Sequence, residues 1–480
     1  MKNLVRFLGM EIRNLQNVGY GKIQLADLKS IQAAPRMAAD VLGIYGQNGS
    51  GKTTFVHAMR LLQLILSGQP LGVDALPYIT SGKDHAELIA TFFLIHEGRR
   101  YCIEYHAGLQ VGLTDQGAEP GIQAQPTVYI AEEAIKVVTQ ISDERWGTKH
   151  TLIRCEQEKE AVFSPKRLVK GITDQDPDTL VNLLVAKKLA KRQCTSFLFS
   201  KDALSVFLQH GPVELSDILR ALHDYGKQYL YVIDTRGWGP INLNMGLPLY
   251  FRVEDAGKHR FFSGSVLFRL DGPTILPKTI YEPLDEAIRL MNPVLEELVP
   301  GLQLELRSVG KQIMPDGKEG RAFEAMSIRS NRRVPLRYES EGIKKIVAIM
   351  NMFIAAYADP SLTLVIDELD AGIFEYLLGE LLSIFEQSGS GQLIFTSHNL
   401  RPLETLHKRS VVFTTVNPQN RYLRLKNIKR NNNLRSVYYN DLQLGGTDEE
   451  LYEKTNNAAI CYALRQIAEQ SALDEEGQSS

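Results

Sequence analysis

Hydrophobic and polar positions follow two different periods along the chain, and the change between them divides the sequence into blocks. Up to about residue 163 the pattern is typical of strands. Residues 41–45 form an apolar run, and HAELIATFFLI followed by RRYCIEY predicts a β-hairpin. From 164 to about 229, apolar residues recur three and four positions apart, as in DTLVNLLVAKKLAKR, which predicts helices. We therefore expect a strand-rich lobe at 1–163 and a mainly helical insert with return strands at 164–276.

The second half of the sequence alternates helical and strand patterns. The segment IYEPLDEAIRLMNPVLEELV predicts a helix and LQLELRSV a strand, and 337–405 then follows the order helix, strand, helix, strand. This alternation is typical of a mostly parallel sheet with helices packed on it. The predicted fold is therefore α/β, with a C-terminal lobe at 277–440. At 441–480 we expect a helix followed by a disordered polar tail.

A glycine-rich segment joins the apolar run at 41–45 to the next helical pattern. It matches GxxxxGK followed by Ser or Thr in full, and it has the strand before and the helix after that this motif requires. Glycines let backbone N–H groups converge on phosphate oxygens, a lysine adds a full charge, and a threonine hydroxyl binds Mg²⁺. The alternative is a glycine-rich turn with an exposed lysine. The segment predicts a site for ATP and Mg²⁺ made by Gly46, Gln47, Asn48, Gly49, Ser50, Gly51, Lys52, Thr53 and Thr54, with Thr53 on the metal.

Two further segments place polar side chains where predicted strands end. The strand at 362–366 is followed by Asp367, expected to hold Mg²⁺, and by Glu368, expected to orient the attacking water or to accept its proton. The strand QLIFT leads to His398, which we expect at the same edge of the sheet and in contact with the γ-phosphate. An acidic loop in solvent and an ordinary core or surface histidine are the alternatives.

The residues Ser340-Glu341-Gly342 precede a helix whose apolar positions begin at Ile343. Ser340 is predicted to cap this helix. The same geometry also makes an anion site, because the N-terminus of a helix carries positive partial charge. We expect that site to face a phosphate held by another subunit.

Composition restricts the partners only weakly. The chain has 480 residues, 44% of them hydrophobic, and its net charge of -2 gives no general attraction to nucleic acid or to a membrane. No apolar stretch is long enough for a signal peptide or a membrane span, and the four scattered cysteines are expected to be buried thiols. We therefore expect a cytoplasmic protein.

Two local basic segments are candidates for contact with partners. The segment 421–435 has no acidic residue, and it interleaves aromatic with basic side chains, which can bind phosphates and stacked bases. A solvated face or a protein interface is the alternative. Its basic members are Arg421, Arg424, Lys426, Lys429, Arg430 and Arg435, and its aromatic neighbours are Tyr422 within the segment and Tyr438 and Tyr439 just after it. The second segment, with Lys187, Lys188, Lys191 and Arg192, is expected to be a charged face of a helix in the insert.

The order and spacing of 46–54, Ser340-Glu341-Gly342, Asp367-Glu368 and His398 resemble the head of an ABC-type ATPase. The variants SEG, DELDAG and TSHN resemble those of RecF/SMC-related bacterial ATPases of the overcoming-lysogenisation-defect class. Within this class the chain is similar to standalone ATPase subunits of anti-phage systems such as PARIS. The resemblance covers about 1–100 and 280–410, and it implies a P-loop NTPase head that carries a helical insert.

The resemblance implies a homo-oligomer in which ATP and Mg²⁺ lie between two heads, with Lys52 of one head facing Ser340 of the other and Asp370 crossing the interface. It implies an ATP-hydrolysing sensor of abortive infection, a form of antiviral defence, that controls a separate toxic effector. The chain after His398 is too short for the fused nuclease domain of longer relatives, so that effector is expected to be a nuclease from the same operon.

The chain also departs from the ABC pattern. Lys344 and Lys345 follow the signature segment, Ser340-Glu341-Gly342, where transporters have glutamine, and no Q-loop glutamine is evident. The adenine contact therefore stays open, with Tyr20 as one candidate. A RecF-like DNA-repair ATPase that binds DNA through 421–435 is the alternative function. A transporter subunit is disfavoured by the signature and the insert, and a plain kinase would leave the signature and His398 without a role.

Overall fold

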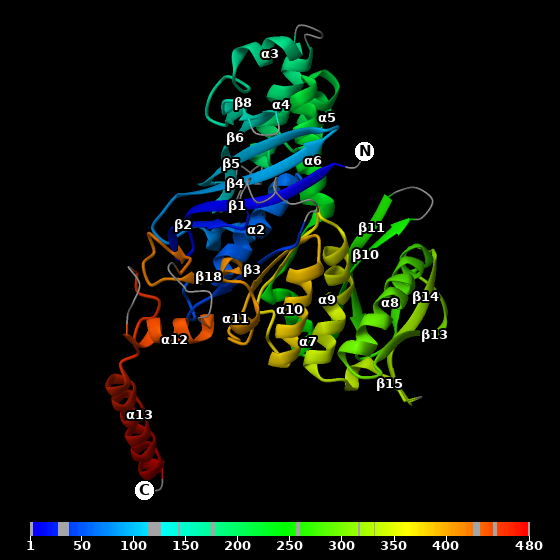
Figure 1. The fold of residues 1–480 in the computed structure, drawn as a ribbon, viewed down its shortest axis with the longest axis vertical. Helices are drawn as coiled ribbons and strands as arrows, with labels where there is room; N and C mark the ends of the chain where they lie inside the picture. The colour runs from blue at the N-terminus through cyan, green and yellow to red at the C-terminus, as the bar shows by residue number, and fades with distance from the viewer. Residues whose placement is uncertain are drawn as a thin grey trace.

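The fold is mixed α/β, and the computed structural model describes residues 3–26, 38–113, 126–142, 145–173, 178–255, 260–314, 317–330, 332–425, 433–444 and 449–478. Two large sheets form its frame, with α2 (Lys52–Leu66) between them and a group of helices at one end (Figure 1). None of the described helices is both long and apolar enough to cross a membrane.

The first sheet is antiparallel, in the order β2-β1-β4-β5-β6-β7, and β8 also pairs with β6. Its strands are β1 (Leu4–Leu15), β2 (Val18–Gln24), β4 (His85–His96), β5 (Arg99–Leu113), β6 (Pro126–Ser142), β7 (Arg145–Trp146) and β8 (His150–Glu156). The expected hairpin is β4 and β5, which are joined at Glu97 and Gly98. Because side chains alternate between the faces of a strand, every second residue of β5 from Tyr101 to Leu109 is buried.

The second sheet brings distant parts of the chain together, in the order β19-β18-β3-β17-β16-β9. Its strands are β3 (Asp40–Tyr45), β9 (Leu230–Ile233), β16 (Thr363–Ile366), β17 (Gln392–Thr396), β18 (Val411–Thr414) and β19 (Tyr422–Leu423). All pair in parallel except β19, which runs antiparallel to β18. β3 therefore lies among strands of the C-terminal lobe, and the carboxyl ends of β3, β16 and β17 meet at one edge.

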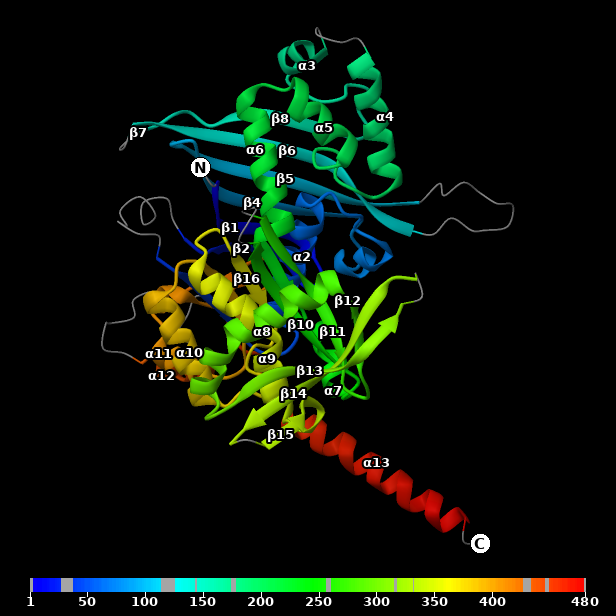
Figure 2. The same ribbon diagram turned by 90° about the vertical axis from the view of Figure 1, so that its right-hand side faces the viewer.

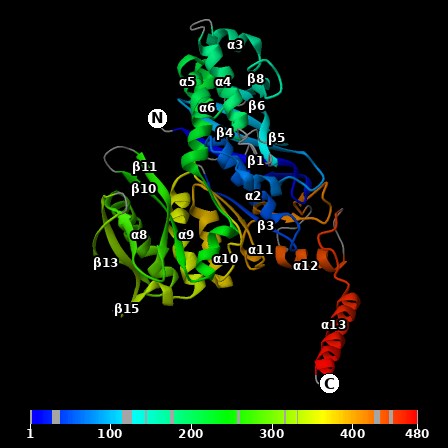
Figure 3. The same cartoon turned by 180° about the vertical axis from the view of Figure 1, so that it is seen from behind.

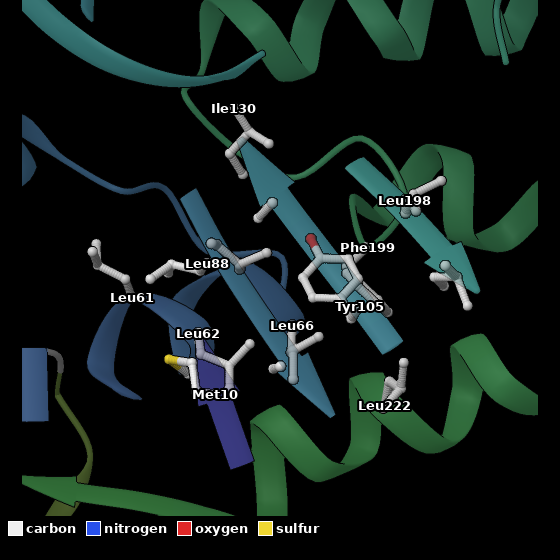
Figure 4. Packing of buried hydrophobic residues seen from close by; sticks show 14 of the residues in the cluster. Met10, Leu61, Leu62, Leu66, Leu88, Tyr105, Ile130, Leu198, Phe199 and Leu222 are labelled. Atoms are coloured by element: carbon white, nitrogen blue, oxygen red, sulfur yellow. The ribbon is translucent and has the colours of Figure 1, made fainter. Parts of the chain in front are cut away.

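Helix α2 fills the space between the two sheets. Leu61, Leu62 and Leu66 of α2 belong to the same buried cluster as Met10 and Leu88 of the first sheet (Figure 4). Val365 and Ile394 of the second sheet join this cluster from the other side. Because α2 starts directly after the glycine-rich loop, packing on both of its faces fixes the direction of the loop.

The helical pattern at 164–229 corresponds to α3 (Lys166–Thr173), α4 (Asp178–Arg192), α5 (Lys201–His210) and α6 (Val213–Asp224), which lie beyond the first sheet (Figure 2). A π-helical turn at Tyr225–Tyr229 extends α6 directly into β9, and a 3-10 turn at Thr235–Trp238 with α7 (Gly239–Asn242) follows β9. The insert is thus connected to a strand of the second sheet without a long loop.

The expected alternation at 337–405 is confirmed by α9 (Glu341–Ala358), β16, α10 (Glu375–Ser388) and β17. Beside α9 lie α8 (Lys278–Leu298), the pair β10 (Gly246–Asp255) and β11 (Arg260–Arg269), and a sheet of β12 (Thr274–Pro277), β14 (Glu319–Arg329) and β13 (Gln303–Ile313), with β15 (Arg332–Pro335) on β14 (Figure 3). Short elements complete the described fold at Val73–Tyr78, Leu336–Tyr338, Pro402–Thr405 (α11) and Lys408–Ser410.

Two expectations for the C-terminal part are wrong. After α12 (Leu434–Leu444), α13 runs from Asn457 to Gln478, so a helix follows as expected but it continues through most of the last dozen residues, for which a disordered polar tail was expected. Alanine, leucine, glutamate and glutamine favour a helix there. The helix extends away from the rest of the molecule in all three ribbon views (Figures 1–3). Cys461 lies on it and is exposed, so the four cysteines are not all buried.

Candidate functional site

The glycine-rich loop between β3 and α2 adopts backbone angles that favour glycine. Gly46, Gly49 and Gly51 have φ values of 153°, 77° and 97°, and Gly51 stands at the N-cap of α2 without a side-chain cap. A Cβ on Gly46 would lie 1.7 Å from Oγ1 of Thr414, so this position has no room for a side chain. The loop therefore leaves backbone N–H groups at the N-terminus of α2 open to an anion.

Lys52 folds back over this loop. Its Nζ donates to the carbonyl oxygens of Gly46 and Gln47, both at 2.9 Å, and only 6% of the residue is exposed. Burial lowers the pKa of Lys52, while the carboxylate of Asp367 acts in the opposite direction. A phosphate group in the loop would offer this ammonium group a stronger partner than two carbonyl oxygens.

Asp367 and Thr53 lie together as the sequence predicts. Thr53 Oγ1 is 3.4 Å from Asp367 Oδ1, which also accepts a hydrogen bond of 2.5 Å from Thr396 Oγ1. Asp367 is fully buried, yet its Oδ2 has no hydrogen-bond partner. An unpaired buried carboxylate oxygen beside a threonine hydroxyl suits Mg²⁺, which takes one or two protein oxygens together with phosphate oxygens. Within the described residues, no group of three or more His, Cys, Asp or Glu side chains could hold a metal ion without added phosphate oxygens.

Glu368 is held by its backbone in an unusual conformation. Its φ is +49°, which side-chain-bearing residues rarely adopt, and its N–H donates to Thr396 Oγ1 at 2.8 Å. Its side chain lines a cavity of about 390 Å³. Thr396, one residue before the predicted SHN segment, therefore fixes both acidic residues, and nothing in the local sequence pattern indicated this role.

The cavity gathers most of the predicted residues from three separate segments. It is lined by Gln16, Asn17, Asn48, Gly49, Gly51, Lys52, Thr53, Thr54, His57, Glu368, Thr396 and His398. Burial and the positive charge of Lys52 lower the pKa of His398, which favours a neutral imidazole at neutral pH. A neutral imidazole can donate one N–H to a phosphate oxygen and cannot act as a fixed cation.

Three residues on the described rim of the cavity were missed by the sequence analysis. Gln16 and Asn17 follow β1, and His57 on α2 stacks on Tyr78, with ring centroids 4.6 Å apart. Thr54 Oγ1 donates to Asn17 Oδ1 at 2.9 Å, which ties the β1–β2 turn to α2. Tyr20 is not among the lining residues, so Gln16, Asn17 and His57 replace it as candidates for contact with the nucleoside.

None of the signature residues Ser340, Glu341 and Gly342 lines this cavity. Ser340 is exposed, and its Oγ accepts the N–H of Ile343 at 3.3 Å, which confirms the predicted N-cap. Gly342 is buried against Gly372, whose carbonyl oxygen would lie 1.9 Å from a Cβ on Gly342. Asp370 Oδ2 accepts the N–H groups of His398 and Asn399 at 3.1 and 3.0 Å. The place of Asp370 at an interface stays a prediction.

The basic segment 421–435 is not the continuous patch that its composition indicated. Arg421 is buried and donates to the carbonyl oxygens of Thr415, Val416 and Asn17. The hydroxyl of Tyr422 donates to Gly51 O at 2.8 Å, and Arg421 also lies next to Gly51. Arg421 and Tyr422 therefore pack against the glycine-rich loop.

The other described members of that segment also have partners inside the chain. Tyr438 is buried against Phe413, Arg424 donates to Gln24 O, and Arg435 forms an ion pair with Glu404. Tyr439 stays exposed, and Lys426, Lys429 and Arg430 lie outside the described residues. In the insert, Lys187 is buried and donates to the carbonyl oxygens of Lys159 and Ala161, so it is not part of a charged surface.

No protein-family model matches the chain, and no curated protein matches it. Among solved structures, an SMC head bound to the C-winged helix domain of ScpA is 13% identical, with a TM-score of 0.41, and the alignment covers 88% of this chain and 98% of that one. An SMC head domain from Thermotoga maritima is 13% identical, with a TM-score of 0.37, and the alignment covers 88% of this chain and 100% of that one. The recombination mediator RecF with ATP is 14% identical, with a TM-score of 0.33, and the alignment covers 82% of this chain and 94% of that one. These are distant likenesses.

Proposed function

We propose that the chain binds ATP with Mg²⁺ in the 390 Å³ cavity and hydrolyses it when a second copy closes on the site. The observation that carries this proposal is the meeting of Lys52, Thr53, Asp367, Glu368 and His398 at one edge of the second sheet. They come from three strand ends, and each has the chemistry that one part of phosphoryl transfer to water requires.

Each residue would have a separate task. Backbone N–H groups of 46–52 and the ammonium group of Lys52 would hold the phosphates, while Thr53 and Oδ2 of Asp367 would bind Mg²⁺, which neutralises phosphate charge when it is bound. Glu368 would accept a proton from water as the water oxygen forms a bond to the γ-phosphorus and the bond to the β-phosphate oxygen breaks. His398 would donate an N–H to the γ-phosphate. The exposed cap of α9 at Ser340 would bind the γ-phosphate of a second copy.

The test compares two substitutions with matched controls. Lys52→Ala is expected to lose nucleotide binding and nucleotide-dependent association, because the loop loses its only side-chain cation. Glu368→Gln is expected to bind ATP, to hydrolyse it about 100-fold more slowly or worse, and to stay associated. The exposed residues Lys83 and Glu380 supply the controls Lys83→Ala and Glu380→Gln, which should behave as the wild type. Undiminished turnover in both site variants would contradict the assignment.

At a finer level, we propose that ATP turnover makes this chain the sensor of an anti-phage system that restrains a separate toxic effector. The signature SEG and the segments DELDAG and TSHN, which resemble those of such ATPases, support this. Affinity purification from cells that carry the native operon, with wild-type and Glu368→Gln chains, should recover the effector in a nucleotide-dependent amount. If deletion of the operon leaves the plating of every phage tested unchanged, the defence role is wrong while the ATPase assignment still stands.

A further inference from the structure

A second, smaller cavity lies between the first turn of α9 and the loop that follows Asp367. Its volume is about 170 Å³, and its lining residues include Trp238, Glu341, Lys345, Glu368 and Gly372. Glu368 lines both this cavity and the larger one. The smaller cavity is therefore bounded on one side by the signature segment and on another by the residue proposed to activate water.

Lys345 is the cation among these lining residues. Only 5% of it is exposed, its Nζ donates to the carbonyl oxygen of Glu368 at 2.7 Å, and it lies 4.5 Å from the ring centroid of Trp238. Burial lowers the pKa of Lys345 to about 8, and the nearby carboxylates of Asp370, Glu368 and Asp367 oppose this effect. An ammonium group is costly to bury, so its place is set by the partners that it has there.

The partners of Lys345 belong to the backbone that aims Glu368. The carbonyl oxygen of Glu368 accepts bonds from Lys345 and from the N–H of Ala371, and the preceding carbonyl, that of Asp367, accepts the indole N–H of Trp238 at 3.1 Å. Because φ of Glu368 is +49°, this conformation is strained for a residue with a side chain and persists only where neighbours hold it. Lys345 and Trp238 supply two of the bonds that do so.

The neighbouring lysine has a different set of partners. Lys344 is as deeply buried, at 4% exposed, but its Nζ donates to Oδ1 of Asn244 and to the carbonyl oxygen of Arg337. Adjacent residues of one helix point to different sides, so the two lysines hold different segments. Lys344 therefore serves as a matched control for the loss of a buried charge from α9.

We propose that Lys345, together with Trp238, is a positioning residue for Glu368 and links the signature turn of α9 to the water-activating carboxylate of the same chain. This inference rests on the proposed function, and it adds a route by which the two sites of a dimer communicate. Contact of Ser340 with the nucleotide of a second copy would displace the start of α9. Lys345 would transmit this displacement to the backbone of Glu368 through its hydrogen bond to the carbonyl oxygen.

The kinetic test uses Lys345→Met, which keeps the length of the side chain but removes its charge and its donor. We expect kcat to fall about tenfold or more while KM changes less than about threefold, because the loss affects the aim of Glu368 and not nucleotide binding. Lys344→Met should keep most of kcat. Unchanged kcat in Lys345→Met, or an equal fall in both variants, would overturn the proposal.

A second measurement does not depend on turnover. The chain has two tryptophans, so in a Trp146→Phe background the emission of Trp238 alone is observed. Lys345→Met should shift this emission and Lys344→Met should not. An unshifted spectrum would refute the link even if the wild-type chain proved not to be an ATPase, whereas a wild type without turnover and with the expected shift would refute only the proposed function.

If Lys345→Met does not fold, Trp238→Phe keeps a ring beneath the ammonium group but removes the bond to Asp367 O. It should lower kcat and leave KM, and an unchanged kcat would count against the proposal.

Discussion

The contact between Gly342 and Gly372 allows a prediction whose size follows from the coordinates. Substitution of Gly342 by alanine would place a Cβ 1.9 Å from the carbonyl oxygen of Gly372, and Cβ contacts closer than 3.0 Å are essentially never found. The start of α9 and the loop at 368–372 must then separate by at least about 1 Å. Both partners are backbone, so no side-chain rotation relieves the clash. We expect a loss of about 1 to 3 kcal/mol in the free energy of unfolding, as for other overpacked sites.

The same displacement would reach Glu368, which lies four residues before Gly372 and is tied to α9 through Lys345. A shift of about 1 Å in a catalytic group can cost about 100-fold in rate, so turnover should fall by that order while nucleotide binding persists. Urea denaturation, phosphate release and binding of a fluorescent nucleotide measure the three quantities. Gly171→Ala in α3 is the control, because nothing lies within 4 Å of a Cβ at this position. Its free energy of unfolding should rise by about 1 kcal/mol, since alanine favours a helix over glycine. Turnover of Gly342→Ala at the wild-type rate would refute the coupling between this contact and the site.

Three further predictions concern residues at the margins of the site. Arg421→Ala should lower the free energy of unfolding by about 2 kcal/mol, measured in urea, and leave any DNA binding and its salt dependence unchanged, because its guanidinium group holds buried carbonyl oxygens. For His398 the folded pKa lies below 6.5, so the stability that the neutral ring contributes is present above pH 6.5 and is lost as the pH falls through the lowered pKa; His398→Gln should flatten that part of a pH series of urea transitions. Phe374, 68% exposed and stacked on Tyr376, lies two residues after Gly372 and just before α10. In the Glu368→Gln background, Phe374→Ser should weaken self-association, measured by sedimentation, by about 1 kcal/mol or more, whereas Ile384→Ser, at an exposed position within α10, should not.

The local structures that the sequence predicted around the candidate site are those fixed by short-range constraints. Three glycines of the loop have positive φ values, and Lys52 follows them at the start of a helix. These residues specify one local geometry with little dependence on the rest of the chain. In the same way, Ser340 caps α9 through a bond that spans three residues. Such features leave a readable pattern because the partners are close in sequence.

The supporting residues could not be predicted, since their partners are distant in sequence. Thr396 gains its contact from Asp367, which follows the neighbouring strand β16, and Trp238 reaches the carbonyl oxygen of Asp367 because β9 lies beside β16. A threonine in a strand and a tryptophan after one carry no local sign of these contacts. The segment 421–435 shows the converse error. Its basic composition suggested a surface, but β19 is the edge strand behind the glycine-rich loop, so Arg421 and Tyr422 are drawn into the interior.

The position of β9 connects the helical insert to the proposed chemistry. The helical part of the insert ends in α6, which continues through the π-helical turn into β9, and β9 pairs along its whole length with β16. Tyr225 in that turn donates to Thr363 Oγ1 at 2.8 Å, and the N–H of Asp367 donates to Ile233 O at 2.9 Å, so both ends of β16 are bonded to the segment that leaves the insert. Trp238 follows five residues after Ile233 and reaches the carbonyl oxygen of Asp367. A partner that shifts α6 along its axis would therefore displace the Asp367 and Glu368 peptides through a strand and an indole, because packed helices and paired strands move as rigid elements.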